Sequence, residues 1–112
     1  MPKQKLNPLP SAAFQILLAL ADGDRHGYGI MRQVAEQTSG RMRLGPGTLY
    51  SSIQALLDGG LIEELDTTEA NERRRYYKLT SAGRKLARSE AERLADLLRV
   101  ARAKKILRGE HV

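Results

Sequence analysis

One stretch near the middle of the chain, residues 45–57, constrains the fold most, because it predicts a short helix with two unlike faces. Its large apolar side chains recur at helical spacing and share one side: Leu49, Ile53, Leu56 and Leu57. Short or polar side chains take the opposite side, with Tyr50 on the flank: Thr48, Ser51, Gln54, Ala55 and Asp58. A solvated helix normally displays Lys and Glu on its outer side, whereas this one carries hydroxyls and an amide.

This helix has two interpretations. When a helix enters the major groove of DNA, Ser, Thr and Gln side chains reach base edges or phosphate oxygens. The alternative is an ordinary amphipathic helix whose outer face is built from small residues. The stretch alone does not separate the two, so the remaining segments of the chain decide between them.

Two helices are expected before this one. The first begins with Ser11 as its N-cap and runs to about residue 21, and it is apolar nearly all round, so it should lie deep in the core. The second runs from His26 to about Thr38. Gly27 and Gly29 in its first turn cost about 1 kcal/mol each relative to Ala. We therefore expect the backbone there to approach a neighbouring helix or a ligand closely.

His26 has three candidate roles: a capping or packing residue, a pH-sensitive group, or a metal ligand. The only other histidine is His111 in the tail, which makes a metal site improbable. Capping or packing is the favoured role.

Two strands are expected after the central helix, over residues 61–65 and 73–79, joined by a polar turn over residues 67–72. The second strand interleaves Arg73, Arg74, Arg75 and Lys78 with two tyrosines, a composition suited to phosphate contact. The alternative is a solvated edge strand whose charges oppose aggregation. Residues 41–44 are a further candidate edge strand of the same small sheet.

A long helix is expected from Ser81 to about Leu107, capped by Thr80. Its small and apolar residues alternate by four and three, which is typical of a coiled-coil seam: Ala87, Ala91, Leu94, Leu98 and Ala101. A helix of about 27 residues is about 40 Å long, which is longer than a core of this size covers. A second copy of the chain is the favoured cover, and a free, fraying helix end is the alternative.

Composition narrows the function. The 112 residues fit one domain, and the chain contains no Cys and no Trp. No apolar run approaches the roughly 20 residues that span a bilayer, so we expect a cytoplasmic protein that does not contact membranes. The net charge of +6 is uneven: residues 1–72 hold six Lys/Arg and nine Asp/Glu, whereas residues 73–108 hold thirteen and three. That asymmetry indicates a polyanionic partner. Without a catalytic or ligand cluster, we predict no enzyme activity, metal or cofactor.

The expected order of helix, helix, helix, hairpin and helix indicates a mainly α winged helix-turn-helix with a small β-hairpin and a long C-terminal dimerisation helix. Residues 1–79 form the expected DNA-binding domain, and residues 80–112 the dimerisation helix and basic tail. On its motifs the chain resembles the PadR family of transcriptional regulators. The matching segments are Leu17–Leu20, His26–Ile30, Gly45–Tyr50, Gly60–Ile62 with Leu56, and Arg73–Tyr77 running into Leu79–Thr80 and Gly83.

The resemblance implies a homodimeric repressor that binds an inverted-repeat operator in double-stranded DNA. It implies that Thr48, Tyr50 and Ser51 lie on the DNA surface, with a wing over residues 67–75. Gln54 is a further candidate DNA-binding residue because it shares the outer face of the central helix. The chain is similar to the smaller branch of the family, some of whose members stack flat aromatic drugs on tryptophan. This sequence has no Trp, which argues against such a drug pocket. Whether the protein has another small-molecule effector stays open, and none is predicted. The alternative function is a winged-helix protein-interaction module without specific DNA binding.

Overall fold

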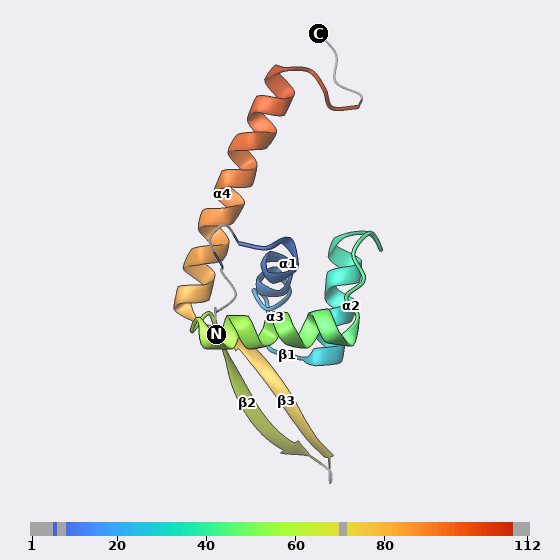
Figure 1. Ribbon diagram of the computed structural model, residues 1–112, viewed down its shortest axis with the longest axis vertical. Coiled ribbons are helices and arrows are strands. Elements are labelled where there is room, and N and C mark those ends of the chain that lie inside the picture. The colour runs from blue at the N-terminus through green and yellow to red at the C-terminus, as the bar shows by residue number, and fades with distance from the viewer. Residues whose placement is uncertain (1–5, 7–8, 70–71, 109–112) are drawn as a thin grey trace.

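The computed structural model describes residue 6, residues 9–69 and residues 72–108, and it describes their side chains except at residues 66–74. Along the chain the elements are α1 (Ser11–Ala19), β1 (Arg25–His26), α2 (Gly27–Gln37), α3 (Pro46–Asp58), β2 (Ile62–Glu69), β3 (Glu72–Leu79) and α4 (Ser81–Ala103). Figure 1 shows α1, α2 and α3 packed together, with the β2–β3 hairpin extending from one end and α4 from the other. The molecule is therefore elongated, with extents of 60 × 30 × 24 Å. The predicted mainly α winged-helix architecture is confirmed.

The helix boundaries follow local chemistry, with one correction near the N-terminus. Pro10, with φ −62° and ψ 150°, is the N-cap of α1 and makes no side-chain cap hydrogen bond, so the prediction that Ser11 is the N-cap is wrong. Ser11 is instead the first helical residue. Gly40 and Gly60, with φ +78° and +72°, follow α2 and α3 as expected for left-handed helix ends.

The sheet differs from the prediction in its third strand. Its order is β1-β3-β2, all antiparallel, and the third strand is Arg25–His26, which pairs with Tyr76 and Tyr77. The candidate strand over residues 41–44 is not a strand. There the Met42 amide donates to Thr38 Oγ1 at 2.9 Å and the Leu44 side chain is buried, so this segment is tied to the end of α2 and to the core.

The hairpin is also longer than predicted. Residues 67–72 were expected to form the turn, but strand pairing continues from Ile62↔Leu79 to Glu69↔Glu72, so only residues 70–71 lie between the strands. The β-branched Thr67 and Thr68 fit a strand as well as a turn, which explains the missed extension.

The core lies where α1, α2, α3 and the base of the hairpin meet. Ile16 and Leu17 of α1 are fully buried, as are Leu49 and Leu56 of α3. The first turns of α4 add Gly83 and Ala87 to the same core, and the Thr80 hydroxyl caps α4 by accepting the Gly83 amide at 3.0 Å. Beyond Ala87 the helix leaves the core.

The end of α4 at Ala103 comes four residues earlier than predicted. The Lys105 amide donates to the Arg102 carbonyl at 3.0 Å, and the Ile106 amide donates to the Ala101 carbonyl at 3.3 Å. With Lys105 at φ +59°, these bonds form a Schellman-type helix end in which Lys takes the position that Gly usually holds.

Candidate nucleic-acid interface

The outer face of α3 is short and polar in the structure, as the sequence predicted. Leu49, Ile53 and Leu56 are buried, and this orientation leaves Thr48, Ser51, Gln54 and Asp58 exposed on the opposite side. Two of these side chains are held by the helix itself: Ser51 Oγ donates to the Thr48 carbonyl at 3.2 Å, and Gln54 Nε2 donates to Asp58 Oδ1 at 3.0 Å. The face therefore presents ordered hydroxyl and amide groups with no long charged side chain across it.

Tyr50 lies on the flank of α3, where three elements meet. Its side chain is 52% exposed, and its hydroxyl sits against Gly27 at the start of α2, where an added Cβ would lie 2.5 Å from the Tyr50 Oη. The close approach expected at the glycines of α2 is therefore confirmed at Gly27. Tyr77 of β3 lies in the same region: burial raises the pKa of its phenol, and the nearby Glu64 and Tyr50 raise it further, while Arg75 lowers it.

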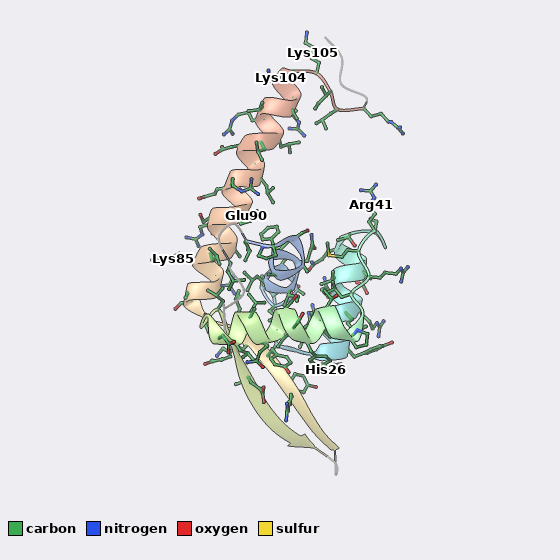
Figure 2. All side chains as sticks on the ribbon, viewed as in Figure 1. His26, Arg41, Lys85, Glu90, Lys104 and Lys105 are labelled. Atoms are coloured by element: carbon green, nitrogen blue, oxygen red, sulfur yellow. The ribbon has the colours of Figure 1, made fainter. Side chains whose placement is uncertain are left out.

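His26 caps α2. Its Nδ1 accepts the Gly29 amide at 3.0 Å, which confirms the capping role favoured from the sequence. Its ring stacks on Tyr28, with ring centroids 6.5 Å apart, and meets Tyr76 of β3 edge-on at 5.4 Å. Figure 2 labels His26 at the start of α2, beside β3, where it pairs with Tyr76.

Tyr28 and Arg32 of α2 lie on the surface next to the His26 ring, and the sequence did not single them out. Tyr28 is 64% exposed, and the Arg32 guanidinium carbon lies 5.9 Å from the centre of its ring. Their i, i+4 spacing on a predicted helix was the available signal. An exposed aromatic ring beside a guanidinium offers a flat face for stacking and a charged group that can pair with phosphate.

The hairpin places its predicted phosphate-binding residues on one strand and acidic residues on the other. Arg75 lies opposite Asp66 and pairs diagonally with Glu64, at 3.7 Å between Nε and Oε2. Arg73 and Arg74 lie opposite the uncharged Thr68 and Thr67, and their side chains are outside the described part of the structure. Residues 62–79 hold four Lys/Arg and five Asp/Glu, so the positive charge of the wing is confined to β3.

The predicted seam of α4 begins in the core and continues into solvent. Ala87 is packed inside the chain at 8% exposure, whereas Leu94 and Leu98 are 39% and 43% exposed. Ala91 is exposed and Ala101 is partly exposed, and Leu97 and Val100 widen the apolar strip. Figure 2 shows Lys85 on the outer side of α4 and Glu90 on the side that faces α1.

Within the described residues, no group of three or more His, Cys, Asp or Glu side chains could hold a metal ion. The helices of that same part of the chain include none with the length and apolar character needed to cross a membrane.

The chain is similar to known proteins in both sequence and fold. The model of the transcriptional regulator PadR-like family matches residues 16–89. A relative from Streptomyces fradiae, an uncharacterized 37.1 kDa protein in transposon TN4556, is 44% identical over 86 residues. That match covers 77% of this chain and 24% of the relative, so the chain spans about a quarter of the relative's length.

Solved structures that share the fold include two regulators of known structure. A transcriptional regulator from Clostridium thermocellum, Cth-833, is 28% identical with a TM-score of 0.71, over 85% of this chain and 92% of that one. Bacillus subtilis PadR in complex with operator DNA is 22% identical with a TM-score of 0.67, over 73% of this chain and 47% of that one. PadR-like proteins are transcriptional regulators and not enzymes. Because the family model matches more than half of its residues, the chain belongs to the PadR-like family of transcriptional regulators.

Proposed function

We propose that this regulator is a cytoplasmic homodimeric repressor that binds an inverted-repeat operator in double-stranded DNA. In this proposal residues 1–79 form the DNA-binding domain and residues 80–112 the dimerisation helix and basic tail. The observation that carries it is the outer face of α3, where Thr48, Ser51 and Gln54 are exposed while the opposite face is buried. A major groove accepts a helix with short hydrogen-bonding side chains, and the structure of Bacillus subtilis PadR with operator DNA supports this use of the fold.

The wing supplies the phosphate contacts in this proposal. Arg73 and Arg74 lie opposite threonines, whereas Arg75 and Lys78 lie opposite Asp66 and Glu63. The first two cations therefore have no acid at the paired position across the hairpin, which makes them the favoured phosphate ligands. Arg75 contributes only after it leaves Glu64.

The exposed apolar strip of α4 supports the dimer. Leu94, Leu97, Leu98 and Val100 are 39–53% exposed on one stretch of helix that the chain's own core does not reach. A contiguous apolar strip on a helix is buried economically by a second copy of itself, because a two-fold axis uses the same residues on both sides.

Selection of bound duplexes from the fragmented source genome tests the DNA proposal, followed by anisotropy titrations of the enriched sequence and a scrambled control at two salt concentrations. We expect an inverted repeat bound at least ~10³-fold more tightly than the scramble. Ser51→Ala should weaken operator binding, while Ser89→Ala on the exposed surface of α4 serves as the matched control. Equal affinity for both duplexes would contradict specific recognition, and no binding at low salt would favour a protein-interaction module.

The dimer is tested by sedimentation equilibrium. The wild type is expected at twice the 12.5 kDa chain mass, and Leu98→Lys is expected to shift the protein toward the monomer. Glu92→Lys introduces the same side chain on the exposed, opposite side of α4 and should leave the mass unchanged. A wild-type protein that sediments at 12.5 kDa at all concentrations would exclude the dimer.

A further inference from the structure

The contact between Gly27 and Tyr50 joins the start of α2 to the flank of α3. A Cβ at residue 27 would meet the Tyr50 Oη at 2.5 Å, Cζ at 3.2 Å and Cε1 at 3.5 Å, so the ring edge occupies the space of the missing side chain. Gly27 is buried, whereas Tyr50 remains 52% exposed. One edge of the ring is thus held by the neighbouring helix, while the remainder faces solvent on the flank of α3, one helical turn before the exposed Gln54.

Helix stability gives no reason for glycine at this position. Gly27 is the first residue of α2, directly after the His26 cap, and among the described glycines only Gly40 and Gly60 have a positive φ. Alanine would fit the backbone conformation and raise the helix propensity. The feature that demands glycine is therefore the approach of the Tyr50 hydroxyl.

We propose that Gly27 is a positioning residue for DNA recognition, because it lets the Tyr50 hydroxyl rest on the start of α2 and so fixes the Tyr50 ring on the DNA side of α3. This inference rests on the proposed DNA binding. It assigns the two parts of Tyr50 different roles: the hydroxyl faces Gly27, and the exposed ring contacts the duplex by stacking against sugar and base edges.

The assignment predicts that a clash at residue 27 moves the ring without unfolding the protein. The atom struck is the far end of a half-exposed side chain, which can swing outward, rather than backbone. Gly27→Ala should therefore fold with nearly unchanged thermal stability, and its operator affinity should fall by on the order of tenfold, as for loss of one good base-edge contact.

Four variants test this in anisotropy titrations with the operator and a scrambled duplex, each accompanied by a thermal unfolding curve. Tyr50→Phe removes the clashing oxygen, so Gly27→Ala should cost far less operator affinity when it is added to Tyr50→Phe than when it is added to the wild type. Gly29→Ala is the matched control in the same helical turn, since its Cβ would meet the His26 ring at an ordinary 3.5 Å.

Three results would overturn the inference while leaving the proposed function intact. Gly27→Ala could bind the operator like the wild type; it could fail to fold, which would place the cost in folding rather than recognition; or it could cost as much affinity when added to Tyr50→Phe as when added to the wild type, which would mean that the hydroxyl clash is not the cause. If the wild type binds no duplex, the proposed function fails and the inference falls with it, so the two failures are distinguishable.

Discussion

Replacing Gly83 by Ala should loosen the attachment of α4 to the domain. Gly83 lies in the first turn of α4, and its added Cβ would be 2.0 Å from the Leu61 carbonyl oxygen and 2.8 Å from Leu79 Cδ1. The carbonyl has little freedom to rotate away, because it accepts the Thr80 amide at 3.1 Å. The neighbouring Gly60 carbonyl is held in turn by the Thr80 hydroxyl at 2.8 Å. The helix itself must therefore move.

The size of the effect follows from three contributions. Forced overpacking costs about 1–3 kcal/mol. Weakening the Thr80–Leu61 hydrogen bond costs about 1 kcal/mol more. Alanine returns about 1 kcal/mol of helix propensity. The net destabilisation is about 2 kcal/mol, which lowers the Tm of a domain of this size by about 10 °C.

The assay is urea and thermal unfolding followed by circular dichroism, at equal protein concentration for all variants because a dimer would make stability concentration-dependent. Gly47→Ala is the matched control: Gly47 also lies in a helical first turn, and nothing lies within 4 Å of its added Cβ, so this variant should gain up to about 1 kcal/mol. A Gly83→Ala protein as stable as Gly47→Ala would refute the reasoning.

Three further predictions concern the wing, the sheet and the cap of α4. Arg73→Gln with Arg74→Gln should reduce the slope of log affinity against log salt by about 0.9 per lost phosphate contact, and an unchanged slope would remove both from the DNA. The raised pKa of Tyr77 means that the folded protein keeps the phenol proton longer than the unfolded chain, so stability is complete below pH 10.0 and falls above it. Tyr77→Phe should flatten that alkaline fall in unfolding experiments, and an unchanged fall would contradict the role given to Tyr77. Thr80→Ala should cost about 1 kcal/mol in urea unfolding, and Thr80→Ser should retain the hydroxyl cap; equal loss in both would contradict the capping account.

Much of the fold could be predicted because its signals are local. The buried face of α3 follows from helical spacing, the ends of α2 and α3 follow from Gly40 and Gly60, and the cap of α4 follows from the Thr80 hydroxyl. A close approach at Gly27 could be predicted, since glycine in the first turn of a helix requires a reason. Its partner Tyr50 could not be predicted, because only the packing of α2 on α3 brings the two residues together.

The wrong predictions concern elements that depend on contacts between residues far apart in the sequence. Residues 25–26 form a strand only because Tyr76 and Tyr77 of β3 lie beside them. The hairpin extends through its threonines because the register across the two strands continues, which no single segment reveals. The end of α4 depends on a left-handed Lys105, where the usual glycine signal is absent. The surface formed by Tyr28 and Arg32 was overlooked because each residue alone is unremarkable in a helix.

The close contact of Gly83 with Leu61 also sets the direction in which α4 leaves the domain. From Gly83, α4 runs on to Ala103, so the far end of the helix lies about 30 Å away at 1.5 Å per residue. A rotation of only about 5° at Gly83 displaces the far end by about 3 Å, close to the ~3.4 Å rise between base pairs. In the proposed dimer, a small rotation at Gly83 therefore changes the spacing of the two α3 helices by about as much as one inserted base pair changes the distance between the operator half-sites.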